Sequence, residues 1–229
     1  MADVERLIQI YKSIISKNKT LKELVKSAKD WEAVYSYAQG IGDAASQSII
    51  SSGTAPEDLE AALIALLRQS HADVSKLCRR VQRLTNDKAG LGIGVIAPEL
   101  DRGAASKIVS ALTGVEDTNM DNLKNMVIKE AMKVVDDSIK QNFEAADTMG
   151  LDCKIVRRYD DVGLHDGTKW AKPCQWCLDR EGTWNSYQEA YDAGAFERHP
   201  GCQCVITYEV GKTRTWSNYA GRWSNIGEL

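Results

Sequence analysis

The residues most able to do chemistry are cysteines and a histidine gathered near the C-terminus. Cys174 and Cys177 form a Cys-x-x-Cys pair, and a second group follows with His199, Cys202 and Cys204. Two close-set ligand pairs joined by a short loop are typical of a tetrahedral zinc site. The four cysteines would complete such a site, and His199 is the alternative to Cys202 as a ligand.

This predicted zinc site is structural rather than catalytic. Four strong protein ligands leave no coordination position for water or a substrate. A segment of roughly 60 residues has a thin core, and a bound metal supplies stability that burial cannot. Disulfides are the alternative that six cysteines allow. A reducing cytosol argues against them, and Cys78, in a helical stretch far from the group, is best interpreted as a small buried hydrophobic residue.

Two catalytic hypotheses also start from this region. Residues 173–177 match the Pro-Cys-x-x-Cys half of zinc deaminases, but that chemistry needs a His-x-Glu upstream, and His165-Asp166 lacks the glutamate. The second hypothesis is a metal-dependent nuclease or other hydrolase that uses His165 and Asp166 as acid–base groups. The simpler interpretation is that these two side chains order a turn, so we predict a protein that is not an enzyme.

Composition narrows the class of protein. The 229 residues are 43% hydrophobic and 27% charged, with a net charge of −3, which is ordinary for a soluble globular protein. No apolar run approaches the roughly 20 residues of a membrane span, and acids near Met1 argue against a signal peptide. Acidic and basic residues nearly balance in both halves, which disfavours a zinc-stapled nucleic-acid adaptor but leaves it as an alternative.

The first 150 residues are predicted to be helical. Apolar residues recur every three or four positions, most regularly from Leu59 to Leu84, as expected for one long amphipathic helix. Thr20–Glu23 and Thr54–Glu57 have the Thr-x-x-Glu form of a capping box. Gly40 and Gly42 predict an interruption. Further helices are expected from Pro98 to about Leu112 and from about Asn119 to Thr148, with Gly150 as the stop.

After Gly150 the predicted elements change. Residues 153–159 and 204–210 have the composition of strands, and residues 186–193 that of a short helix. The expected fold class is therefore α+β. We predict a helical domain at 1–150, a Cys/His zinc-binding module of mixed helix and strand at 151–210, and an aromatic C-terminal tail at 211–229 with too little aliphatic content for its own core.

The order of motifs in residues 153–210 resembles the phage Mu protein F-like family. An Asp-Gly turn, the Cys-x-x-Cys pair and a Gly-x-Trp step at Gly182 precede His199-Pro200-x-Cys202-x-Cys204. The last motif, commonly His-Pro-Asn-Cys-Arg-Cys in that family, is the most specific; here Gly201 and Gln203 replace the asparagine and arginine.

This resemblance implies a virion component. Family members are minor capsid, or head morphogenesis, proteins of tailed bacteriophages. It implies several copies in the capsid interior or portal region, made in the bacterial host cytoplasm and acting in head assembly, DNA packaging or ejection. The implied partners are the portal or major capsid protein and, weakly, packaged DNA, with no membrane. Some members carry toxin domains after this module; only the short aromatic tail follows it in these 229 residues, so we carry over no toxin activity.

Overall fold

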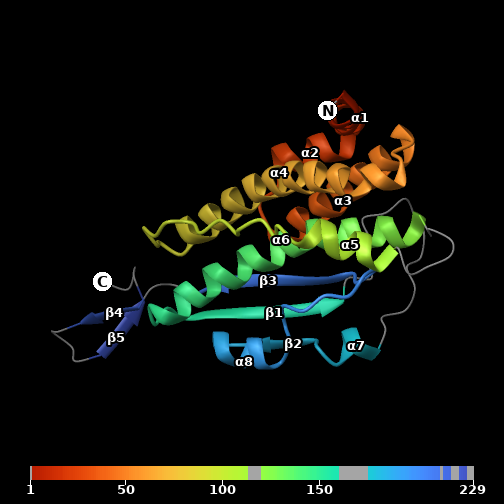
Figure 1. The fold of residues 1–229 in the computed structure, drawn as a ribbon. Helices are drawn as coiled ribbons and strands as arrows, with labels where there is room; N and C mark the ends of the chain where they lie inside the picture. Colours follow the sequence, from red (N-terminus) through yellow and green to blue (C-terminus); the bar gives the residue numbers. More distant parts are fainter. Residues whose placement is uncertain (1, 113–119, 160–174, 212–213, 218–221, 226–229) are drawn as a thin grey trace.

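The protein folds as a layer of helices over a small antiparallel sheet (Figure 1). This computed structural model describes residues 2–112, 120–159, 175–211, 214–217 and 222–225. Its mainly helical first part and its short sheet near the C-terminus confirm the predicted α+β class. None of the described helices combines the length and apolar character needed to cross a bilayer.

In the described part of the chain, six helices make up the first layer, which we call the helical body. Helix α3 lies at its centre and packs against α1, α2, α4 and α6. The long α4 confirms the amphipathic pattern, because Leu63, Leu66, Val74 and Val81 are all fully buried. The bounds are α1 Ala2–Lys17, α2 Lys19–Ser27, α3 Trp31–Ser52, α4 Leu59–Lys88, α5 Ala104–Leu112 and α6 Met120–Thr148.

The two glycines of α3 do not interrupt the helix, contrary to the prediction. A Cβ at Gly42 would lie 2.6 Å from the backbone Cα of Ile128, so the missing side chain allows α3 and α6 to approach closely. A Cβ at Gly40 would meet only the flexible end of Leu21. Glycine destabilises a helix interior, and at Gly42 the close packing of α3 against α6 offsets that cost.

Several helix boundaries differ from those predicted. The side chain of Asn18, not Thr20, caps α2 by accepting a hydrogen bond from the Leu21 amide at 3.1 Å. Residues Pro56–Asp58 form a 3-10 turn, so α4 begins after the predicted capping box rather than in it. Helix α5 begins at Ala104, later than the predicted Pro98. The stop at Gly150 is confirmed by its positive φ of 69°.

The sheet has the strand order β2-β1-β3. Strands β1 (Cys153–Tyr159) and β3 (Cys204–Val210) pair antiparallel over their full lengths, with Ile155 opposite Tyr208. Both strands were predicted, whereas the short edge strand β2 (Gly182–Trp184) was not. Helix α8 (Tyr187–Asp192) lies within the predicted 186–193 segment, and α7 (Gln175–Leu178) is an additional single turn.

The helical body and the sheet share one hydrophobic core. Ile155, Ile206 and Tyr208 belong to the same cluster of buried residues as the interior of the helices. The Phe143 ring of α6 meets the Tyr208 ring edge to face, with centroids 5.9 Å apart. The boundary predicted at residue 150 thus coincides with a change from helix to strand while the core continues across it; the division into separate domains stays a prediction.

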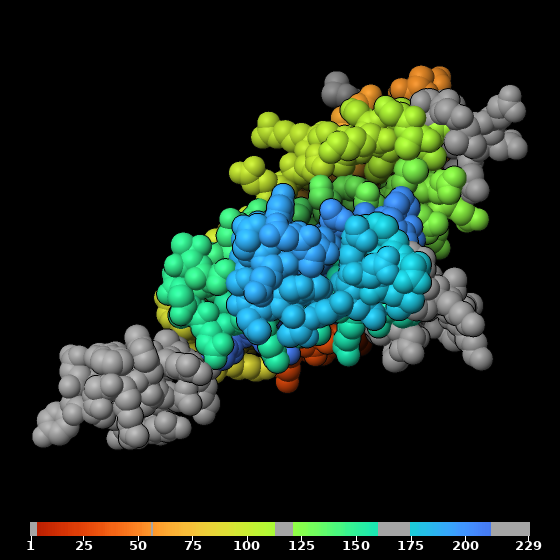
Figure 2. Space-filling model, turned by 90° about the horizontal axis from the view of Figure 1, so that it is seen from below, coloured from red at the N-terminus to blue at the C-terminus, as the bar shows by residue number. Residues whose placement is uncertain are grey.

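The C-terminal segment contains a second, two-stranded sheet. Strands β4 (Arg214–Ser217) and β5 (Arg222–Asn225) pair antiparallel, with Trp216 opposite Trp223, and lie beyond the end of β3 (Figure 1). These strands were not predicted. On another side of the molecule, the segment of α7, β2 and α8 forms the face opposite the first helices, cyan to blue in Figure 2.

Candidate metal centre

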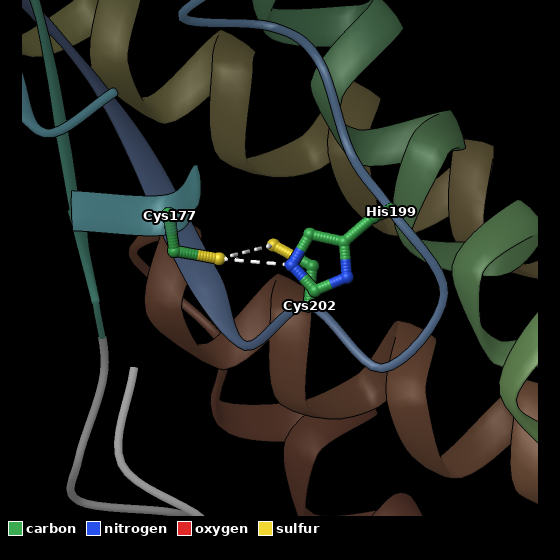
Figure 3. A group of neighbouring side chains, drawn as sticks. All are labelled: Cys177, His199 and Cys202. Atoms are coloured by element: carbon green, nitrogen blue, oxygen red, sulfur yellow. Dashed lines mark hydrogen bonds between the residues drawn. The ribbon is translucent and has the colours of Figure 1, made fainter. Parts of the chain in front are cut away.

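Three of the predicted ligands come together. Cys177 lies on α7, and His199 and Cys202 lie on the loop before β3, with their side chains directed at one another (Figure 3). One ligand atom from each residue falls within a group in which all separations are under 4.8 Å. The Cys177 and Cys202 sulfurs are 3.8 Å apart, and the Cys177 sulfur is 3.0 Å from His199 Nε2. These side chains could hold a metal ion.

The distances fit a tetrahedral ion closely. Two thiolates bound to one zinc at about 2.3 Å would lie about 3.8 Å apart, which is the separation of the Cys177 and Cys202 sulfurs. A thiolate and an imidazole nitrogen on the same ion would lie about 3.6 Å apart. The Cys177–His199 pair therefore needs to open by only a fraction of an ångström.

A tight turn places His199 beside Cys202. The Cys202 amide donates to the His199 carbonyl at 3.1 Å, and Gly201 has a φ of 77°, a left-handed conformation that side chains other than glycine rarely adopt. The glycine of the His-Pro-Gly-Cys motif therefore has a conformational role. Gly201 allows the tight turn that directs the side chains of His199 and Cys202 toward the same point.

The ring of His199 is oriented for coordination through Nε2. Its Nδ1 lies 2.7 Å from the Pro200 carbonyl, which can only accept a hydrogen bond, so Nδ1 carries the proton. In the neutral ring this leaves the Nε2 lone pair facing Cys177, the arrangement usual for a metal-bound histidine. The Trp176 ring meets the imidazole edge to face at 5.0 Å.

The other predicted ligands are placed differently. Cys204 is fully buried in the same small cluster as Cys177 and Cys202, but its sulfur does not belong to the group of three. The structure therefore brings together both His199 and Cys202, between which the sequence did not decide. Cys174 lies outside the described residues, and so do His165 and Asp166 of the catalytic hypothesis.

A buried arginine of β1 holds the segment that leads to these ligands. Arg157 is only 2% exposed, and its guanidinium donates to the carbonyls of Ala195 and Glu197 at 2.8 and 2.6 Å. Its second terminal nitrogen lies 3.8 Å from the Cys202 sulfur. Arg157 thus supplies donors to loop carbonyls that no strand pairs, and it places a positive charge beside a candidate ligand.

A second buried arginine ties the same loop to the helical body. Arg198 makes a two-pronged ion pair with Asp136 of α6, at 2.7 and 2.8 Å, and the two side chains are 3% and 1% exposed. Its guanidinium also donates to the carbonyls of Cys202 and Cys204, at 3.2 and 3.0 Å. The Tyr35 hydroxyl of α3 donates to the same carboxylate. One network therefore joins α3, α6 and the ligand loop.

The surroundings favour a thiolate at Cys202. A hydrogen bond from Cys204, followed by the charges of Arg198 and Arg157, lowers the pKa of Cys202 against the opposing effect of burial. The pKa of Cys204 is raised instead, because it holds the shared proton and is itself buried. Thiolate is the metal-binding form of cysteine, so these surroundings keep the Cys202 sulfur in the form that binds a metal ion.

Sequence reasoning found the cysteines and the histidine but missed the arginines and Asp136. Arginine and aspartate are usually exposed, and nothing in their spacing marks them as buried. The one available signal was position, since Arg198 directly precedes His199.

Comparisons with models of protein families, with curated proteins and with solved structures found no match to this chain.

Proposed function

We propose that this chain is a structural protein of a bacteriophage head, a minor capsid or head morphogenesis protein, and not an enzyme. The observation that carries the proposal is the convergence of His199 and Cys202, from the motif most specific to the phage Mu protein F-like family, with Cys177. The motif that carries the resemblance is thus also the part of the chain that builds a candidate metal centre.

In this proposal the bound ion is zinc and its role is structural. Thiolate and imidazole ligands suit zinc, and the 3.8 Å separation of two sulfurs suits its tetrahedral geometry. Cys174 or Cys204 would complete the coordination. The neighbours of the site support a structural role, because Arg157 and Arg198 bond loop carbonyls and a buried carboxylate rather than project into solvent.

The proposed partners are the portal protein or the major capsid protein, with packaged DNA contacted weakly. The helical body offers long helices for protein–protein contact, and the metal-held loop fixes the sheet to that body through Arg198. The proposed location is the capsid interior or the portal region, with several copies in each particle.

Particle composition tests the proposal directly. Particles purified from the phage or induced prophage that encodes this chain should contain it, in a fixed ratio to the portal protein, as measured by quantitative mass spectrometry. A frameshift in its gene should reduce the yield of filled heads. Particles that contain portal and major capsid proteins but lack this chain would refute the role.

A further inference from the structure

A groove of about 380 Å³ lies at the far end of β3 from the metal centre. Its walls come from three elements: the junction of α2 and α3 at residues 29–32, the end of α4 at residues 85–89, and residues 207–210 of β3. Its volume is within the range of small-ligand and peptide sites. It lies against the outer edge of the sheet, because among the described strands β3 pairs with β1 alone.

The register of the sheet shows which backbone groups of β3 face this edge. The Gly211 amide donates to Asp152, its direct partner across the strands, so the alternate residues Glu209, Thr207 and Val205 also bond to β1. The amides and carbonyls of residues 204, 206, 208 and 210 therefore point away from the sheet. The bond from Arg198 to the Cys204 carbonyl agrees with this assignment.

The two ends of that outer edge differ. Near the metal centre the outward groups have partners: Arg198 bonds the Cys204 carbonyl, and the Ile206 amide bonds the Tyr35 hydroxyl. At the groove, the described part of the chain supplies no hydrogen-bond partner for the outward backbone groups of Tyr208 and Val210. This end is an open strand edge, of the kind that accepts an additional strand.

Unpartnered polar side-chain atoms occur at the same place. Trp31 and Tyr208 both line the groove and are each 3% exposed, yet within the described residues Trp31 Nε1 and the Tyr208 hydroxyl have no hydrogen-bond partner. Buried polar atoms normally find partners, and an indole N–H needs an acceptor. The strand edge therefore offers donors to an occupant, and two covered side-chain atoms beside it also lack partners.

The charges of the groove favour an acidic occupant. Glu32 and Glu209 pair with Arg158 and Lys154, and the Asp30 carboxylate caps α3. Lys29 and Lys88 also line the groove and are exposed, and no ion pair to another described residue satisfies either. Carboxylates of an incoming segment would have these two ammonium groups as partners.

We infer that this groove binds an extended, acidic peptide segment of a partner protein, which adds to β3 as a fourth strand. The backbone of Tyr208 and Val210 would supply the strand hydrogen bonds, and Lys29 and Lys88 would select for acidic side chains. The chain's own tail is a poor occupant, because residues 211–229 carry Lys212, Arg214 and Arg222 against Glu228 alone. The inference does not depend on the phage role.

The test uses the full-length protein and two fluorescent peptides with blocked ends, one alternating glutamate with valine and one alternating lysine with valine. Fluorescence anisotropy should show at least tenfold tighter binding of the acidic peptide at low salt. Lys29→Glu/Lys88→Glu should reverse this preference. Lys76→Glu, an exposed lysine on the same helix α4, is the control and should leave it unchanged.

Val210→Pro tests the strand addition itself. Proline removes the outward amide of residue 210, which is not part of the ladder to β1, so the fold should persist while affinity falls about fivefold. Hydrogen exchange gives a second readout. In the free protein the amides of Tyr208 and Val210 should exchange fast while those of Thr207 and Glu209 stay protected; the peptide should slow the first pair.

Other results would overturn the inference. Equal affinity for the two peptides, or no loss with Val210→Pro, would exclude an acidic strand at this edge. Slow exchange of the Tyr208 and Val210 amides in the free protein would mean that the tail or a second copy already covers the groove. Sedimentation over a range of concentrations would then separate these two occupants.

Discussion

The helical body and the module formed by β1, α7, β2, α8 and β3 are held together in different ways. The body is packed by apolar side chains at helical spacing, such as Ile41, Leu66 and Ile139, all fully buried. The module buries Arg157 and gathers cysteines and a histidine around it. Helices satisfy their own backbone groups, whereas the module's loops leave carbonyls that need outside donors. Arg157 and Arg198 supply those donors, and the clustered thiol and imidazole side chains could hold a metal ion beside them.

Breaking the link between the two regions should have the largest effect. Asp136→Ala would leave the Arg198 guanidinium buried without its carboxylate, at a cost of about 3–5 kcal/mol in the free energy of unfolding. Urea denaturation followed by circular dichroism measures this loss. Glu144→Ala, at an exposed position of the same helix, should cost little. A similar cost for both variants would mean that the ion pair does not join the regions.

Removing the metal should act mainly on the module. Purified protein should carry about one zinc per chain. Protein kept at zinc concentrations well above Kd should be more stable to unfolding than chelated protein by about 3–4 kcal/mol. Hydrogen exchange should increase first in residues 153–210 and later in α3 and α4.

Metal analysis of two variants provides the control. Cys177→Ser should lose the zinc, while Cys78→Ala, in the interior of α4, should retain it. A protein that contains no metal and whose cluster cysteines all react freely with thiol reagents would contradict a metal-held module.

Close helix packing should matter within the body, at the contact of α3 with α6. Gly42→Ala would push a methyl group against the backbone of Ile128, and we expect a loss of about 1–3 kcal/mol in thermal or urea unfolding. Gly40→Ala is the matched case on the same helix, where only the Leu21 side chain must move. Its cost should be offset by the better helix propensity of alanine. Equal losses would show that α3 and α6 are not in close contact.

The smallest effect is expected at Asp137, the neighbour of Asp136. Burial raises the pKa of Asp137 to about 6, against the partly opposing charges of Lys133 and Lys140. The folded state therefore favours the protonated form, so this group's contribution to stability is present below about pH 4 and is lost as the pH rises to about 6.

Asp137→Asn should consequently gain about 1 kcal/mol at pH 7 and nothing at pH 4, as measured by denaturation at both values. The same change at Asp136 should destabilise at pH 7. The same substitution at two adjacent residues would thus change stability in opposite directions, because Asp136 is ion-paired with Arg198 and Asp137 is not. A gain that is the same at both pH values would show that Asp137 titrates normally.

Periodicity and ligand spacing predicted much of this fold. The apolar pattern gave α4, strand composition gave β1 and β3, and Cys-x-x-Cys with His-Pro-Gly-Cys-Gln-Cys gave three side chains that converge. These signals are local or depend on one residue type. Such signals can be recognised in a single sequence, because each helix or strand must bury one face, and each ligand must be present, whichever elements pack beside it.

The features of the fold and the site that were not predicted depend on contacts between distant segments of the chain. Gly40 and Gly42 predicted a break, because a single sequence does not show that Ile128 will lie against α3. The ion pair of Asp136 and Arg198 joins residues 62 positions apart, and each is ordinary on a surface. Helix starts also shifted, as at Asn18, because neighbouring residues can compete to cap the same turn.

The same ion pair has a consequence for biosynthesis. Asp136 leaves the ribosome well before Arg198, since 62 residues separate them. Until then the nascent helices contain a carboxylate that has Tyr35 but no cation, and burial of such a group is unfavourable. We therefore expect full closure of α3 on α6 to be less favourable until Arg198 has been made. The module, which is made last, supplies the cation that the helical body lacks. A chain that ends before Arg198 would therefore leave the Asp136 carboxylate without its arginine, and we expect such a chain to be recognised by cellular quality control.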